Sequence, residues 1–122
     1  MPDPLDRGSL DDLLAMSGGD PALFGELLDA FLADADQYAG ELETAAGSDD
    51  PAAALVRPAH SLKSNAMTVG ATRLAGLCRT LEADAKAGDV GSPSDRIAEV
   101  RAELEVVRAA IVAARAEVTA NG

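Results

Sequence analysis

The chain of 122 residues is poor in aromatic and β-branched residues. It has no tryptophan, one tyrosine and two phenylalanines, together with two isoleucines and eight valines. Because aromatic and β-branched residues favour strands, their scarcity argues against a β-sheet protein. The abundant residues are alanine (26) and leucine (15), which are strong helix formers. The composition therefore predicts an all-helical protein, and the length fits one domain with one core.

Cysteine and histidine each occur once, as Cys78 and His60. A single cysteine excludes an internal disulfide and fits a reducing cytoplasm. One histidine and one cysteine are too few for a metal site rich in either residue. A di-iron bundle would need Glu-x-x-His, whereas Arg57 stands three residues before His60. We therefore expect no metal ion and no other cofactor in this chain.

Positive charge is also scarce, with 10 Lys and Arg against 21 Asp and Glu and a formal net charge of −11. Such an acidic surface repels nucleic-acid backbones and anionic lipids, so neither is an expected partner. No 18-residue apolar run is present, and Met1–Gly8 lacks the apolar stretch of a secretory signal. We expect a cytoplasmic protein, and the starting Met without a linker favours a free-standing one.

Proline, glycine and capping residues divide the chain into helical segments. Asp20-Pro21 and Asp50-Pro51 each read as an N-cap followed by proline at the first helical position. Ser9 is the expected start of a short first helix. The expected helices span residues 10–16, 21–46, 51–67, 71–87 and 94–119. The expected apolar stripe of the second is Leu23, Leu27, Leu28, Phe31, Ala35, Tyr38 and Leu42.

Short loops between long helices favour antiparallel neighbours. The predicted fold is an antiparallel up-and-down four-helix bundle with a short additional N-terminal helix. Residues 1–122 would form a single domain, with 1–8 flexible and 9–122 in the bundle. A coiled-coil homodimer competes, because the last helix repeats apolar residues at alternating three- and four-residue spacing. Wide apolar stripes on three separate helices favour the monomeric bundle.

The histidine is predicted to face outward in the middle of the third helix. On a helical wheel, Leu55, Ala59, Leu62, Ala66 and Val69 cluster within about 40° of the core direction. His60, Ser64 and Met67 lie about 140°, 180° and 120° from it, and Lys63 and Val56 lie on the flank. Apolar Val56 and Met67 beside an exposed histidine suggest a docking surface, although packing against neighbouring helices explains them equally well.

Residues 59–82 read AHSLKSNAMTVGATRLAGLCRTLE. This string resembles the histidine phosphotransfer domain, whose pattern is Ala-His-x-Leu-Lys-Gly, a Gly-Ala, and Leu-x-x-Leu-Cys-x-x-Leu-Glu. The similarity runs from about Leu10 to Glu82, and the final helix is compatible with it. Ser64 departs from the family, which usually has glycine there so that a partner's aspartate can approach.

The resemblance implies a phosphorelay intermediate without autonomous catalytic activity. His60 would accept a phosphoryl group from a receiver-domain aspartate and pass it to another, and Lys63 would offset the charge of that group. The implied partners are response-regulator receiver domains and a hybrid sensor histidine kinase, with Mg²⁺ bound only in the partner receiver. Ser64 would leave access open and donate to a phosphoryl oxygen.

Glu82 is the expected orienting residue, because family members commonly place Gln or Glu here near the histidine. It would accept the Nδ1–H of His60 and leave the Nε2 lone pair free for attack. A simple helix salt bridge from Glu82 to Lys86 or Arg79 is an equally good interpretation. Cys78 lies on the core side of its helix and is expected to be buried and inert.

Two other functions stay open at the level of sequence. One is a receiver-binding adaptor or decoy that carries no phosphate. The other is the phosphoacceptor module of a chemotaxis-type kinase, in which an ATP-binding domain phosphorylates His60 directly. An enzyme with its own active site is disfavoured, because the sequence has no phosphate-binding glycine loop and no metal-ligand set.

Overall fold

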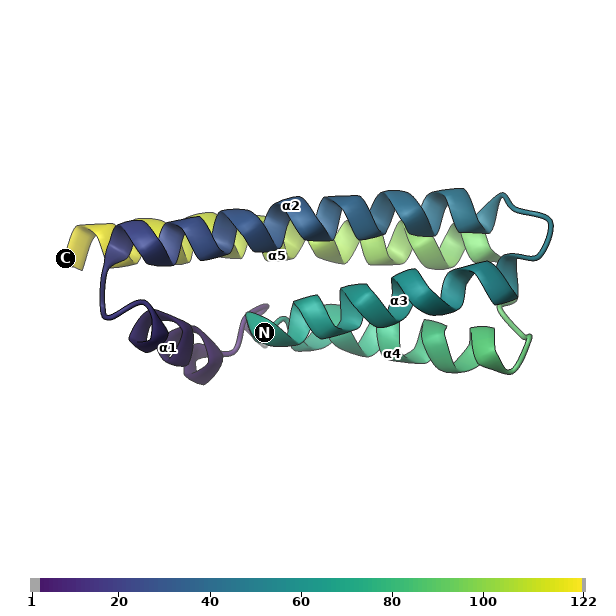
Figure 1. Cartoon of the computed structure of the whole chain (residues 1–122), viewed down its shortest axis with the longest axis horizontal. Helices are drawn as coiled ribbons and strands as arrows, with labels where there is room; N and C mark the ends of the chain where they lie inside the picture. The colour runs from purple at the N-terminus through teal and green to yellow at the C-terminus, as the bar shows by residue number, and fades with distance from the viewer. Residues whose placement is uncertain (1–2, 122) are drawn as a thin grey trace.

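The computed structural model of the chain describes residues 3–121, and these residues form five helices and no strand. Helices α2 to α5 run alternately in opposite directions, and α1 lies beside one end of the bundle (Figure 1). The predicted all-helical bundle with an additional N-terminal helix is confirmed. The helices are α1 (Arg7–Met16), α2 (Pro21–Ala46), α3 (Pro51–Thr68), α4 (Thr72–Lys86) and α5 (Pro93–Asn121).

Two of these helices begin as the sequence predicts. The Asp20 carboxylate accepts the backbone N–H of Ala22 at 3.0 Å, and Pro21 is the first residue of α2. The Asp50 carboxylate accepts the N–H of Ala53 at 3.3 Å at the start of α3. A capping carboxylate satisfies an N–H that has no partner within the helix, and proline has no N–H to satisfy. The Asp-Pro pairs therefore determine where both helices start.

The helices have unequal lengths, and this inequality gives α1 its place. Helix α2 has 26 residues and α5 has 29, whereas α3 has 18 and α4 has 15. At about 1.5 Å per residue, α2 extends about 12 Å beyond the length of α3. Helix α1 fills the space that α3 and α4 leave beneath α2 and α5 (Figure 1). Leu10 and Leu13 of α1 are buried there.

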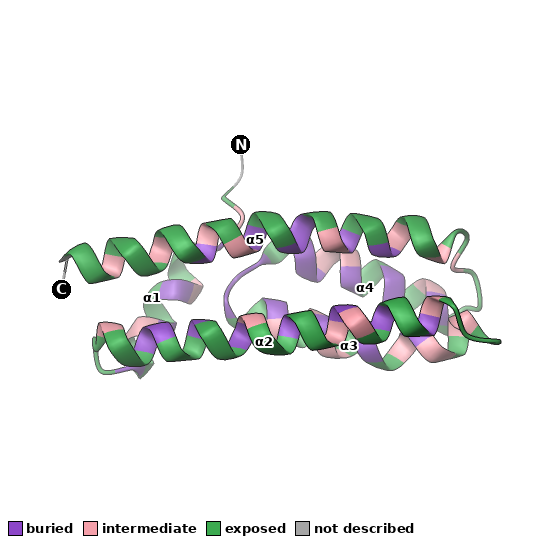
Figure 2. Cartoon of the chain, turned by 90° about the horizontal axis from the view of Figure 1, so that it is seen from above, coloured by how far each residue is buried: buried purple, intermediate pink, exposed green. Residues whose placement is uncertain are grey.

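The core is made mainly of leucine and alanine, with a few valine, isoleucine and phenylalanine side chains. Buried positions form inward-facing stripes along the helices (Figure 2). The stripe predicted for α3 is confirmed, because Leu55, Ala59, Leu62, Ala66 and Val69 are all fully buried. The largest fully buried side chains are Phe24, Leu28, Leu42, Leu55, Leu62, Leu74, Leu81, Leu104, Ile111, Val69, Val100 and Val107.

The stripe predicted for α2 is partly wrong. Leu23 and Leu27 are 40% and 37% exposed, whereas Phe24 and Gly25 are buried. Phe24 lines a hollow with residues of α1 and α5, because at this end of the bundle those helices, and not α3, are its neighbours. The buried direction of α2 therefore changes along its length, and a single helical wheel cannot follow such a change.

Helices α2 and α5 are joined by three ion pairs on their outer side. Because the helices are antiparallel, partners spaced by seven residues on one helix meet partners spaced by seven on the other. The pairs are Asp29–Arg115, Asp36–Arg108 and Glu43–Arg101. Gly25 provides room for the first pair, since a Cβ there would lie 2.8 Å from Nε of Arg115.

The start of α1 differs from the prediction. The helix begins at Arg7, and the Asp6 carboxylate caps it by accepting the backbone N–H and the hydroxyl of Ser9 at 3.0 and 2.9 Å. Leu5 is buried in the core. The division at residue 9 is therefore wrong, because Leu5 belongs to the core and residues 7–8 belong to α1, while residues 1–2 lie outside the described part of the chain.

Gly70 makes the turn between α3 and α4 and holds the N-terminal segment. Its φ of +70° favours glycine, and its carbonyl accepts the Asp6 N–H at 2.8 Å. A Cβ at this position would lie 2.7 Å from the Cβ of Asp6 and 2.8 Å from that of Ser9. The predicted break at Gly70 is thus also the site where α1 is anchored.

We predict that Gly70→Ala destabilises the protein by about 2 kcal/mol or more, because it combines a left-handed backbone with a steric clash. Urea denaturation followed by circular dichroism measures the change. Gly76→Ala in α4 is the matched control: its Cβ meets nothing within 4 Å, and alanine there should stabilise by about 0.5–1 kcal/mol. Equal effects of the two substitutions would contradict the anchoring role of Gly70.

Candidate functional site

Helix α3 presents His60 on its outer side, as the wheel predicts. The His60 side chain is 58% exposed, and Ser64 and Met67 are exposed on the following turns. Val56 and Lys63 are half-buried at the flank. The structure therefore places Val56, His60, Ser64 and Met67 along one accessible strip of α3, next to α4.

Glu82 lies opposite His60 on α4, and its carboxylate is almost completely buried, with 7% of the side chain exposed. Oε2 lies 3.0 Å from Nδ1 of His60 and 3.0 Å from Nζ of Lys86. Oε1 accepts a 2.7 Å hydrogen bond from Nζ of Lys63. One carboxylate thus joins three of the cationic or titratable side chains of α3 and α4.

Both interpretations of Glu82 drawn from the sequence find a contact in this arrangement. The carboxylate reaches the imidazole, and it also forms the helix salt bridge with Lys86. Arg79 makes no salt bridge to Glu82. Lys86 is a member of this cluster and not an alternative to it, and its position one turn after Glu82 is the sequence signal for that contact.

The two ammonium groups determine the ionisation of Glu82. Hydrogen bonds from Lys63 and then Lys86 lower the pKa of the carboxyl to about 2, against the opposing effect of burial and with a smaller contribution from His60. Glu82 is therefore ionised at neutral pH and can only accept hydrogen bonds. The 3.0 Å contact consequently requires a proton on Nδ1 of His60. In the neutral imidazole this leaves the lone pair on Nε2.

The remaining candidates have simpler environments. Within residues 3–121 the Ser64 hydroxyl donates no hydrogen bond, but the Ser64 carbonyl accepts one from the Thr68 hydroxyl at 3.3 Å. Met67 is 54% exposed and lines a shallow hollow of about 230 Å³ with Arg79 and the N-terminal segment. Cys78 is buried, and burial raises the pKa of its thiol to about 12, which makes it unreactive as expected.

Residues 3–121 contain no cluster of three or more histidine, cysteine, aspartate or glutamate side chains that could hold a metal ion. Within the same part of the chain, no helix has the length and apolar character needed to cross a membrane.

Comparison with known proteins agrees with this geometry. The profile of the Hpt domain family matches residues 26–110, and the chain belongs to this family. A crystal structure of histidine-containing phosphotransfer protein B (HptB) from Pseudomonas aeruginosa PAO1 is similar, with a TM-score of 0.85 and 28% sequence identity. The match covers 96% of this chain and 98% of that one. No curated protein matches the sequence significantly.

The family and the structural match support a histidine phosphotransfer role in phosphorelays. Proteins of this family are carriers rather than catalysts, and they interact with receiver domains and kinases.

We predict that Glu82→Gln lowers the free energy of unfolding by at most about 3 kcal/mol at neutral pH, since it removes a carboxylate whose pKa is about 2 instead of about 4.5. A carboxyl group whose pKa is lower in the folded state stabilises the fold at pH values above its pKa in the unfolded state. This stabilisation is lost as the pH falls towards the lower, folded-state pKa. The difference between the two proteins should therefore shrink from pH 4.5 to pH 2. Urea denaturation across this range tests it, and a difference independent of pH would contradict it.

Proposed function

We propose that this protein carries a phosphoryl group on Nε2 of His60 between aspartates of receiver domains. The observation that supports this proposal most directly is the contact of Nδ1 with an ionised, buried carboxylate on the side chain of Glu82. This contact orients the ring so that Nε2 is the nucleophilic nitrogen. The His60 side chain is more than half exposed, so a partner can reach that atom. The imidazole therefore needs no dedicated base.

In the transfer step, the Nε2 lone pair attacks the phosphorus of the partner's aspartyl phosphate. The bond from phosphorus to the carboxylate oxygen breaks, and the carboxylate leaves with the electron pair. The imidazole becomes positively charged while keeping its Nδ1 proton, and the Glu82 carboxylate at 3.0 Å stabilises this charge. Transfer to a second receiver reverses each bond change. Phosphoryl transfer depends mainly on positioning and charge stabilisation, which these contacts provide.

Lys63 is proposed to offset the charge of the bound phosphoryl group. Its ammonium group is 2.7 Å from Glu82, and its side chain is 20% exposed on the flank towards α4. Glu82 thus holds the ammonium group beside the histidine instead of leaving it free in solvent. The Mg²⁺ ion that phosphoryl transfer requires would belong to the partner receiver.

The strip around His60 is proposed to dock the receiver. Val56 and Met67 supply apolar surface on either side of the histidine, and Ser64 keeps the intervening turn small. A hybrid sensor kinase would provide the donor receiver, and a response regulator the acceptor. We expect this exchange to take place in the cytoplasm with the protein as a monomer.

We predict that purified phosphorylated receiver domains from the same genome label the wild-type protein and not the His60→Gln variant. The label should be acid-labile and alkali-stable, as a phosphoramidate is. Because His60 is on the surface, the variant should fold with an unchanged circular dichroism spectrum. Label on the variant, or an acid-stable label on the wild type, would contradict His60 as the acceptor.

Ser64→Gly separates the carrier from a receiver-binding adaptor. The smaller residue should leave the transfer rate equal or raise it a few-fold, because the partner's aspartate approaches this turn more easily. If receivers bind the wild type without labelling it and Ser64→Gly restores labelling, Ser64 blocks transfer and the wild type is an adaptor. Labelling by an ATP-binding kinase domain alone, without any receiver, would instead identify a chemotaxis-type module.

A further inference from the structure

The charge of this acidic protein is strongly segregated along the chain. Residues 51–86 contain five Lys and Arg residues against Glu82 and Asp84, a net charge of +3. The rest of the chain contains the other five cations and 19 acidic residues, a net charge of −14. Helix α3 itself contains no acidic residue. The helix that presents His60 is therefore cationic in a molecule that is otherwise acidic.

Ion pairs within the molecule increase this contrast. Six of the ten cations form a salt bridge with an acidic residue away from the histidine. These pairs are Arg7–Glu117, Arg73–Glu103, Arg96–Asp84, Arg101–Glu43, Arg108–Asp36 and Arg115–Asp29. The other four cations, Arg57, Lys63, Arg79 and Lys86, all belong to α3 and α4.

These four cations have only one close carboxylate among them in the described part of the chain. Lys63 and Lys86 share Glu82. Arg57 and Arg79 are exposed, and no carboxylate of residues 3–121 lies within 4.0 Å of either guanidinium. Glu41 lines the same shallow groove as Arg57, but its carboxylate lies more than 4.0 Å from the guanidinium. The charge of both arginines therefore faces solvent.

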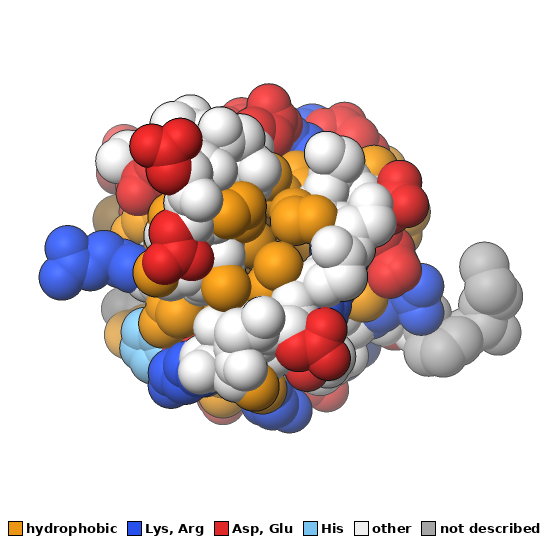
Figure 3. Space-filling model, turned by 90° about the vertical axis from the view of Figure 1, so that its right-hand side faces the viewer, with side chains coloured by type: hydrophobic (Ala, Val, Ile, Leu, Met, Phe, Trp, Pro, Cys, Tyr) orange, Lys and Arg blue, Asp and Glu red, His pale blue; other side chains and the backbone are white. Residues whose placement is uncertain are grey.

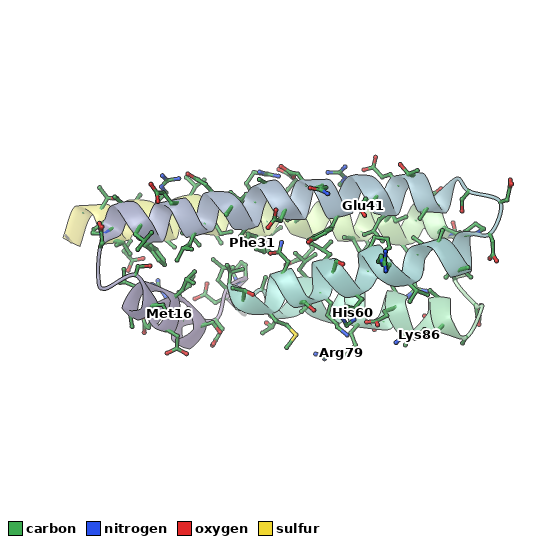
Figure 4. All side chains as sticks on the ribbon, in the orientation of Figure 1. Met16, Phe31, Glu41, His60, Arg79 and Lys86 are labelled. Atoms are coloured by element: carbon green, nitrogen blue, oxygen red, sulfur yellow. The ribbon has the colours of Figure 1, made fainter. Side chains whose placement is uncertain are left out.

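One arginine lies on each of the two helices that form the site. Arg57 is one turn before His60 on α3, and Arg79 is one turn before Glu82 on the antiparallel α4. His60, Arg79 and Lys86 lie on the same side of the α3–α4 pair (Figure 4). Seen from the end of the bundle, the single histidine lies next to cationic side chains at the lower left edge (Figure 3). We call Arg57 and Arg79 the arginine pair.

We infer that the arginine pair selects and orients an acidic protein face, the carboxylate-rich phosphorylation site of a receiver domain. This inference rests on the proposed function. A phosphorylated aspartate beside Mg²⁺ needs further carboxylates as ligands, so the partner's site is acidic. The net charge of −14 on the rest of the chain repels such a face, and the arginine pair attracts it. Only approach towards His60 is electrostatically favourable.

Charges that act during approach affect the rate at which two proteins meet. They affect the chemical step after docking much less. Steering raises association rates by about 10- to 1,000-fold and weakens with salt, because the screening length is about 10 Å at 0.1 M. The arginine pair should therefore affect the second-order rate of transfer and its salt dependence. The first-order rate at saturating receiver should stay unchanged, because neither arginine bonds to His60 or Glu82.

The test compares Arg57→Gln/Arg79→Gln with the control Arg101→Gln/Arg108→Gln, which loses the same two charges from the α2–α5 side. Transfer from a phosphorylated receiver is followed by rapid quench between 25 and 500 mM NaCl. At low salt the first variant should lose about 3- to 10-fold in second-order rate and show a flatter salt dependence, and the control should match the wild type. The reversal Arg57→Glu/Arg79→Glu should lose more than about tenfold.

The inference would be overturned if the two double variants had equal second-order rates. It would also be overturned if the arginine-pair variant lost only first-order rate at saturating receiver, and either result would leave the carrier function intact. If the wild type accepts no phosphate, the proposed function fails, and equilibrium binding of the same receivers decides the inference separately. Weaker binding of the arginine-pair variant alone supports it. Equal binding by both variants, or no receiver binding at all, rejects it.

Discussion

The buried carboxylate of Glu82 is the interaction on which the geometry around His60 depends. A charged group excluded from water is tolerated only when it is paired and hydrogen-bonded, and here two ammonium groups and an imidazole fulfil this condition. Lys63 and His60 come from α3, whereas Glu82 and Lys86 come from α4. The same contacts therefore hold the two short helices in register, fix the tautomer of the histidine and keep an ammonium group beside it.

The long helices show how the same kind of force acts on the outside of the bundle. Asp29, Asp36 and Glu43 on α2 meet Arg115, Arg108 and Arg101 on α5, and all three pairs can form together in only one antiparallel register. Exposed ion pairs are individually weak, at about 0.2–1 kcal/mol each. Their effect here is specificity of register, and within residues 3–121 the two cations without a close carboxylate, Arg57 and Arg79, lie on α3 and α4.

The features that the sequence predicts correctly depend on local chemistry, and those that it predicts wrongly depend on neighbouring helices. Asp-Pro pairs locate the starts of α2 and α3, and the regular stripe of α3 predicts both its buried side and the exposure of His60. The stripe of α2 misplaced Leu23 and Leu27, because their surroundings depend on α1 and α5 and not on the helix itself. The predicted start of α1 at Ser9 is wrong, because Asp6 caps the helix from three residues earlier.

The sequence by itself determined the helical class, the helix boundaries to within a few residues and the outward direction of His60. These follow from propensity, capping and the 3.6-residue period, which act over a few neighbouring residues. Only the tertiary structure decided that Glu82 is buried and shared among His60, Lys63 and Lys86. It also decided that no carboxylate of residues 3–121 lies close to Arg57 or Arg79. The physical reason is that burial and ion pairing depend on how separate helices pack, and residues 22 positions apart meet only when α3 and α4 lie side by side.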